Sequence, residues 1–277
     1  MRKVNKYMFM VMTAVVFSAC GDDNEYEGVG PQDNVEAKAG VTFVSAGDAE
    51  EEADPDSETV FTVELMRDNT KGVVDVEPEF IKNTDDLFEV SAAHFADGED
   101  RATVTVKSIK APEAGRTYDV ELTVPEAYRY LYKETDGFFS YKRTFTYVTW
   151  NVVATGTYTY SLYFEGEDAG LSLYRCVQFP ERYKIANWGG GVDFFFTHDA
   201  KDNVEVASCF IGYVHPSYGD VYVSEVASLK SVASEAQYSY YDGESNTYFF
   251  DVAYHVSAGV FGLGYETFKL DEINNNE

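Results

Sequence analysis

Aromatic side chains in loop-like stretches are the residues of this 277-residue sequence best suited to bind a ligand. The densest stretch is IGYVHPSYGDVYV, residues 211–223. Tyrosine and tryptophan rings have an apolar body and a polar edge, so they can stack on the C–H faces of sugars at half-wetted positions. The alternative for each single residue is packing, because strands are generally rich in aromatic residues. The candidate ligand-binding residues are Trp188, Tyr213, His215, Tyr218 and Tyr222.

No spacing of nucleophiles, histidines or glycines predicts a catalytic or cofactor site. The sequence lacks a G-x-S-x-G elbow, and its histidines do not form an H-E-x-x-H pair. The run WGGGVD, residues 188–193, lacks the Lys-Ser/Thr ending of a phosphate loop, so we expect a turn or bulge there. With 48 acidic residues a carboxylate pair is inevitable and therefore uninformative. We expect no cofactor and no catalysis; a polysaccharide-acting enzyme is the alternative.

The first twenty residues have the pattern of an export signal. Arg2, Lys3 and Lys6 precede an apolar run that is only about half the ~20 residues a membrane-spanning helix needs. Ser18 and Ala19 then precede Cys20, and this arrangement resembles the lipobox of bacterial lipoproteins, in which the cysteine is acylated. The alternative is an ordinary secretory signal that happens to contain a cysteine.

The residues after Cys20 suggest where such a lipoprotein would reside. The sequence GDDNE resembles the acidic export signal that directs lipoproteins of the Bacteroidetes to the outer face of the outer membrane. We expect a signal peptide at 1–19, a lipidated acidic tether at 20–37 and a protein anchored in the outer membrane through Cys20, facing the cell exterior.

The charge of the chain excludes one class of partner. The formal net charge is −27, and loss of the three basic residues of the signal changes it to −30. Such a chain repels nucleic acid. The 45% hydrophobic and 16% aromatic content nevertheless suffices for packed cores.

Alternation of apolar and polar residues predicts an all-β fold. In VFTVELMRD, Phe61, Val63 and Leu65 share one face, and later runs such as VDFFFTHD and NTYFFDVAYHV are bounded by turn residues. We expect two tandem antiparallel β-sandwich domains, or a sandwich followed by a barrel-like domain, with the seam at Thr155–Gly156. The predicted boundaries are 38–154 and 155–271, with a disordered tail at 272–277.

The first of these domains resembles the Calx-β module, an immunoglobulin-like sandwich. The resemblance runs from Val41 to about Val124 and is clearest in FADGEDRATVTV. It implies an adhesive or extension module, in some members with calcium at one end. The second domain is similar to C-terminal β-domains of surface lipoproteins of gut Bacteroidetes, whose activity is mostly undefined.

The acidic loop GDAEEEADPDSE, residues 47–58, offers weak calcium candidates. Calcium takes six to eight oxygen ligands. The calcium-binding members of the resembled family also carry two aspartates where this sequence has Lys110, Ala111 and Pro112. We therefore favour a solvated loop over a metal site; the calcium candidates are Asp48, Glu50, Glu52 and Asp54.

Cys176 and Cys209 are the two cysteines beyond Cys20, and they lie 33 positions apart in strand-like runs. A disulfide is chemically permitted in an exported protein. Two buried thiols acting as small apolar residues are favoured, since no flanking pattern suggests metal or redox chemistry.

Together these features favour a non-catalytic binding protein of the cell surface. A glycan is the expected ligand, because aromatic loops suit sugar rings. The alternative is a structural or adhesion protein that contacts another outer-membrane protein.

The lipoprotein prediction has a direct test at Cys20. Mass spectrometry of the membrane-extracted protein should show a chain that begins at Cys20 and carries acyl mass, and Cys20→Ser should release the protein from the membrane fraction. An unmodified chain beginning at another residue would contradict the prediction.

Overall fold

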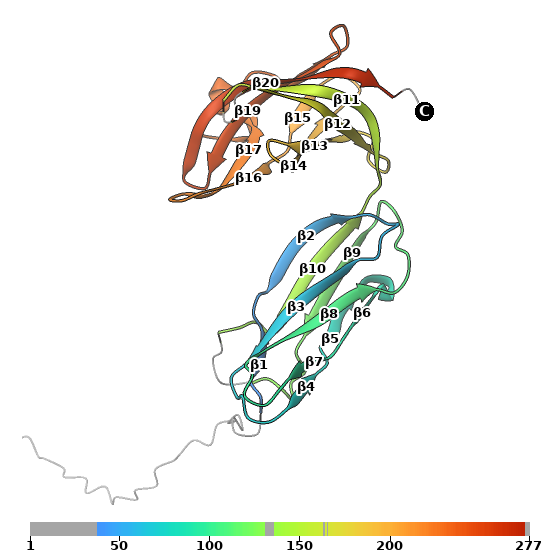
Figure 1. Cartoon of the computed structure of the whole chain (residues 1–277), viewed down its shortest axis with the longest axis vertical. Coiled ribbons are helices and arrows are strands. Elements are labelled where there is room, and N and C mark those ends of the chain that lie inside the picture. The colour runs from blue at the N-terminus through green and yellow to red at the C-terminus, as the bar shows by residue number, and fades with distance from the viewer. Residues whose placement is uncertain (1–37, 131–135, 163, 165, 275–277) are drawn as a thin grey trace, which may run out of the picture.

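The computed structural model describes residues 38–130, 136–162, 164 and 166–274, which form two successive β-domains (Figure 1). The all-β prediction is confirmed, because the regular structure is strand apart from three short 3-10 turns. Cys20, the expected signal peptide and the tether lie outside the described residues. In the part of the chain that is described, no helix is long and apolar enough to span a membrane.

The first domain packs two four-stranded sheets around one hydrophobic core. The orders are β1-β3-β8-β6 and β2-β10-β9-β5, and β4 pairs with β7. The predicted alternation is observed: Phe61, Val63 and Leu65 are buried, whereas Thr62 and Glu64 are exposed. The strands are β1 (Val41–Phe43), β2 (Gly47–Ala53), β3 (Val60–Arg67), β4 (Val74–Val76), β5 (Glu79–Asn83), β6 (Phe88–Val90), β7 (Ala93–Phe95), β8 (Arg101–Ser108), β9 (Thr117–Thr123) and β10 (Ser140–Tyr147).

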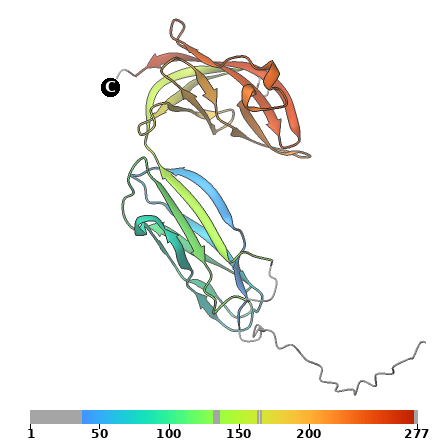
Figure 2. The same ribbon diagram turned by 180° about the vertical axis from the view of Figure 1, so that it is seen from behind.

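The second domain is one ten-stranded sheet in the order β15-β14-β13-β12-β11-β20-β19-β17-β16, with β18 beside β19. Only Ala207 and Ser208 separate β15 at one end of the sheet from β16 at the other, so the sheet curls on itself like a barrel (Figures 1 and 2). The strands are β11 (Trp150–Tyr160), β12 (Gly166–Cys176), β13 (Arg182–Trp188), β14 (Val192–His198), β15 (Val204–Val206), β16 (Cys209–His215), β17 (Gly219–Glu225), β18 (Tyr240–Asp242), β19 (Thr247–Val256) and β20 (Gly259–Ile273).

Aromatic rings fill the inside of the curled sheet. Tyr158 stacks on Phe250 with centroids 5.9 Å apart, and Phe194 meets Phe250 edge-on at 5.1 Å. Such ring pairs stabilise a core by about 0.5–1.5 kcal/mol each beyond the effect of buried area. The large rings at most 3% exposed are Tyr158, Trp188, Phe194, Phe196, Tyr248, Phe250, Tyr254 and Phe268.

One carboxyl group lies among these rings. Glu266 is fully buried and accepts hydrogen bonds from the hydroxyls of Tyr158 at 2.8 Å and Tyr254 at 3.0 Å. The Ser161 N–H donates a third bond at 3.2 Å. Burial raises the pKa of Glu266 despite these donors. The cluster ties β11, β19 and β20 together inside the core.

The two domains meet at a short link. β10 ends at Tyr147 and β11 begins at Trp150, so the seam expected at Thr155–Gly156 lies inside β11. Gly156 has a packing role there, because a Cβ at this position would come within 2.4 Å of the Lys269 carbonyl oxygen. The glycine therefore marks a close approach of strands and not a domain boundary.

Cys176 and Cys209 are both buried and free. Burial raises the pKa of the Cys209 thiol to about 11, so the thiol stays protonated at neutral pH. The run at 188–193 is the turn between β13 and β14, and Gly189, Gly190 and Gly191 all have positive φ there. Both features agree with the predictions from the sequence.

A second buried carboxyl group, Glu225, closes one side of the curled sheet. Glu225 accepts hydrogen bonds from the Val206 N–H at 3.0 Å and from the Ser239 hydroxyl at 2.8 Å. It is only 6% exposed, and burial raises its pKa from 4.5 to about 7, with Asp251 and Glu205 contributing repulsion. The buried site therefore favours the protonated form.

This shift predicts a pH-dependent stability. Between about pH 4.5 and 7 the folded state keeps a proton that the unfolded state has lost, so the contribution of Glu225 falls as the pH rises through this window. At pH 8, Glu225→Gln should raise the free energy of unfolding by about 1–3 kcal/mol, with little change at pH 4. Urea unfolding followed by tryptophan fluorescence reports this domain, since Trp150 and Trp188 both lie in it.

The matched control is Glu244→Gln, which removes an exposed carboxylate from the turn after β18. It should leave the pH dependence unchanged. A Glu225→Gln variant whose stability follows the wild-type pH curve would contradict the account of this site.

Candidate ligand-binding surfaces

Four rings gather at the tips of two neighbouring hairpins of the second domain. His215 lies 4.8 Å from Tyr218 and 5.6 Å from Phe261, and Tyr213 meets His215 edge-on at 6.4 Å. Tyr213 is 41% exposed, Tyr218 53% and Phe261 45%. We call Tyr213, His215, Tyr218 and Phe261 the hairpin cluster; it lies on the β16–β17 and β19–β20 hairpins.

Local turn chemistry positions this cluster. The His215 Nδ1 accepts a hydrogen bond from the Ser217 N–H at 3.1 Å, which fixes the ring at the start of the turn. Gly219 follows with φ of +79°, a conformation that favours glycine. Phe261 is the extra residue where the β19–β20 register shifts, because Tyr254 pairs with Gly262 and His255 with Val260. The bulge aims its ring outward.

Tyr222 lies beside the hairpin cluster in a half-buried row. Its ring stacks on His255 at 5.9 Å and 25° and lies 5.9 Å from Phe210. The Ser224 hydroxyl and His255 Nε2 are 2.8 Å apart, and burial lowers the pKa of His255. Tyr222 is partly buried in this row.

Trp188 does not belong to this surface. It is fully buried in the barrel core, where its ring contacts Phe194 at 5.0 Å and meets Tyr158 edge-on at 5.7 Å. The candidate set from the sequence is corrected on this point, because a ring without solvent access cannot stack on a ligand. Of the five candidates, Tyr213, His215 and Tyr218 come together, and Tyr222 lies on the same hairpin with Phe210 and His255 as its ring partners.

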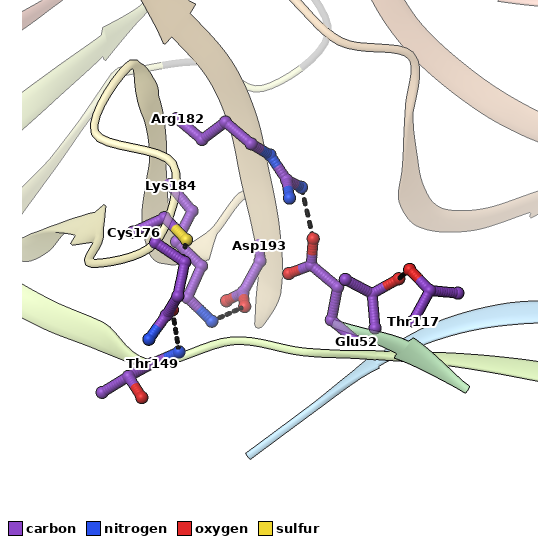
Figure 3. Close-up of polar contacts among 9 residues, drawn as sticks. Glu52, Thr117, Thr149, Cys176, Arg182, Lys184 and Asp193 are labelled. Carbon is purple, nitrogen blue, oxygen red and sulfur yellow. Dashed lines mark hydrogen bonds and ion pairs between the residues drawn. The ribbon is translucent and has the colours of Figure 1, made fainter. Parts of the chain in front are cut away.

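A cleft of about 760 Å³ lies where the two domains meet. Its walls are the acidic end of β2 and the outer face of β11, β13 and β14, with Trp150 between them. Figure 3 shows Arg182 reaching from the second domain to Glu52 of the first, with which it forms an ion pair. Volumes of this size and a position between domains are typical of ligand sites.

On the cleft wall formed by the second domain, positively charged side chains contact an aromatic ring. The Lys184 Nζ lies 2.8 Å from Asp193 Oδ2 and 5.1 Å from the Trp150 ring centroid. The Arg182 guanidinium carbon is 5.7 Å from the same ring. Cation–π contacts of this kind contribute about 0.5–1 kcal/mol at exposed sites. Two charge pairs therefore line the cleft: Glu52–Arg182 joins the domains, and Lys184–Asp193 lies within the second domain.

The weak calcium candidates lie along this edge. Asp48, Glu50 and Glu52 alternate along β2, Asp54 follows it, and Glu52 is engaged by Arg182. Alternate residues of a strand are about 6.6–6.8 Å apart. Among the described residues, no group of three or more His, Cys, Asp or Glu side chains is placed to hold a metal ion.

Sequence reasoning missed Phe261 and the cleft. Phe261 belongs to VFGLGYETF, where alternation alone assigns it to a strand and gives no reason for exposure. The opposite charges of EEE at 50–52 and of Arg182 and Lys184 were a possible signal for the cleft. Their pairing depends on the link between the domains, which spacing in the sequence does not define.

No family model matches the chain, and a search of curated proteins finds no match. Among solved structures it is similar to a protein of unknown function from Bacteroides ovatus, at 8% identity and a TM-score of 0.32. That alignment covers 86% of this chain and 92% of the other. A two-domain protein of unknown function from Bacteroides fragilis matches at 10% identity and a TM-score of 0.31, covering 86% and 87% of the two chains. At these TM-scores the likeness carries no argument about the site.

The ion pair in the cleft predicts a measurable coupling between the domains. In a double-mutant cycle of Glu52→Gln and Arg182→Gln, the two changes should be non-additive by about 0.2–1 kcal/mol in the free energy of unfolding. The coupling should shrink at high salt, because the pair is partly exposed. Tryptophan emission, to which Trp150 beside Arg182 contributes, gives the measurement.

Glu50→Gln is the control for this cycle, since it removes a charge from the same strand two positions away. It should show no coupling to Arg182→Gln. Additive effects of Glu52→Gln and Arg182→Gln at low salt would show that the pair does not join the domains.

Proposed function

We propose that this chain is a non-catalytic glycan-binding protein, lipid-anchored through Cys20 on the outer face of the outer membrane. The observation that carries the binding proposal is the hairpin cluster, in which four rings contact one another and three of them are more than two-fifths exposed. A folded protein gains from burying such rings. Their exposure at two adjacent hairpins therefore calls for a partner.

The composition of the cluster favours a sugar. Tyr213 and Tyr218 combine an apolar ring with a hydroxyl, and the His215 Nε2 and the nearby Asp220 can bond to sugar hydroxyls. The strong negative charge of the chain disfavours an anionic glycan. An uncharged polysaccharide is the ligand that suits both properties.

The first domain serves this function as an extension module. Its resemblance to the Calx-β module implies such a role, and its place between the tether and the second domain suits it. The Glu52–Arg182 ion pair would keep the second domain oriented on the first. In this proposal the first domain lifts the hairpin cluster away from the membrane.

Retention in native gels tests the proposal. A soluble chain from residue 28 onward is run in gels cast with uncharged polysaccharides, namely xylan, mannan, mixed-linkage β-glucan and amylose, and with the anionic polygalacturonate. We expect retardation by at least one uncharged polysaccharide, and Tyr218→Ala should weaken it about 3- to 10-fold, which corresponds to one ring contact.

Phe138→Ala is the matched control, because Phe138 is an exposed ring, 47% accessible, in the first domain. It should be retarded like the wild type. Migration of the wild type unaffected by every polysaccharide would overturn the glycan proposal and favour a protein partner.

A further inference from the structure

A second group of rings, two of them exposed and one partly buried, lies on the outer face of the same sheet. Tyr240 stacks on Phe249 with centroids 4.8 Å apart and planes at 14°, and Phe249 stacks on Tyr265 at 6.1 Å and 29°. Tyr240 is 41% exposed and Tyr265 37%. We call Tyr240, Phe249 and Tyr265 the outer ladder; it crosses β18, β19 and β20.

The barrel core does not account for this ladder. On β19 the inward residues Tyr248 and Phe250 fill the core, whereas Phe249 between them faces outward. On β20 the inward residues Glu266 and Phe268 are fully buried. The ladder therefore belongs to the opposite side of the sheet, where polar residues are the usual choice.

The ladder is held in a defined geometry. The Tyr265 hydroxyl donates a hydrogen bond to the Tyr238 carbonyl oxygen at 3.3 Å. Burial, followed by the neighbouring Tyr240, raises the pKa of the Tyr265 phenol to about 12, so it stays neutral and able to donate. A preorganised pair of stacked faces needs little ordering when a ligand binds.

Strand β20 connects the ladder to the hairpin cluster. Phe261 and Tyr265 lie four positions apart on β20, and both side chains face outward. This spacing separates them by about 13 Å along the strand. Thr267, the next outward residue of β20, pairs with Thr159 of β11, whereas Tyr265 itself pairs with the buried Asp251 of β19. Along β20 the face thus carries the Phe261 ring, Leu263, the Tyr265 ring and the Thr267 hydroxyl in succession.

We infer that the outer face of β20 binds an extended, unbranched, uncharged polysaccharide that contacts the hairpin cluster and the outer ladder at once. This inference rests on the proposed glycan binding and adds a second contact region. A single sugar ring is too short to reach both ring groups, whereas a linear chain lying along β20 contacts both. We expect an uncharged polysaccharide because the chain, with a net charge of −27, would repel an anionic one.

Dependence on ligand length is the test. The polysaccharide that retards the protein in native gels is cut into size-fractionated oligomers from disaccharide to decasaccharide, and the dissociation constant of each is measured by calorimetry. We expect affinity to rise with length and then level off. Tyr265→Ala should weaken binding of the longest oligomer about 3- to 10-fold and leave the shortest binding oligomer unaffected.

Two controls distinguish loss of the Tyr265 ring contact from a general change in the fold. Tyr265→Phe keeps the stacking face and should retain most of the affinity for long oligomers. Phe138→Ala, in the first domain, should bind every oligomer like the wild type. Loss of binding in Tyr218→Ala at every length, together with loss in Tyr265→Ala at long lengths only, would support two regions on one chain.

The outcomes also distinguish failure of this inference from failure of the proposed glycan binding. Binding that Tyr218→Ala weakens but that shows no length dependence and no effect of Tyr265→Ala would overturn the inference and leave glycan binding intact. Absence of binding to every polysaccharide would overturn both. A dimer in size-exclusion chromatography that Tyr265→Ala dissociates would show that a second copy covers the ladder, which also overturns the inference.

Discussion

The closure of one ten-stranded sheet around a core of aromatic rings is the constraint on which the second domain depends. A curled sheet of this size must fill its interior, and Tyr158, Trp188, Phe194 and Phe250 do so in mutual ring contact. Because side chains alternate along a strand, the neighbours of these residues are forced outward. Core packing does not constrain the residue types at these outward positions, so they can be residues that bind a ligand.

The outward positions are used unevenly. On β11 they carry Thr155, Thr157 and Thr159, which is ordinary for a solvent-facing sheet. On β18, β19 and β20 they instead carry Tyr240, Phe249 and Tyr265. A surface of stacked rings is costly in water unless a partner covers it. The concentration of rings on one half of the sheet is the physical basis of the proposed glycan surface.

The junction between the two domains restrains the orientation of the second domain, which carries the proposed glycan surface. The link between β10 and β11 is only Val148 and Thr149, and each forms a backbone hydrogen bond with one domain, to Ala53 and from Val177 respectively. The Glu52–Arg182 pair bridges the cleft beside it. A two-residue link that is hydrogen-bonded to both domains, together with this ion pair, restricts domain motion more than the link or the ion pair would alone.

Local alternation was sufficient to predict the strands and their faces, as Phe61, Val63 and Leu65 show. It could not separate Trp188, fully buried, from Tyr218, 53% exposed, because both stand next to turns in aromatic stretches. That difference depends on packing partners: the Trp188 ring lies against Phe194 and Tyr158 in the core, whereas the Tyr218 ring lies against His215 at the surface. Phe261 joined the cluster only through a register shift between β19 and β20, a contact that the sequence does not encode locally.

Hydroxyl-radical footprinting of the chain with and without the retained polysaccharide tests the central claim most directly. Radicals oxidise exposed aromatic rings, so protection reports the covered face. The account predicts reduced oxidation of Tyr213, Tyr218 and Phe261 and unchanged oxidation of Phe138. Protection confined to the interdomain cleft around Trp150, with the hairpin cluster oxidised as in the free protein, would contradict it.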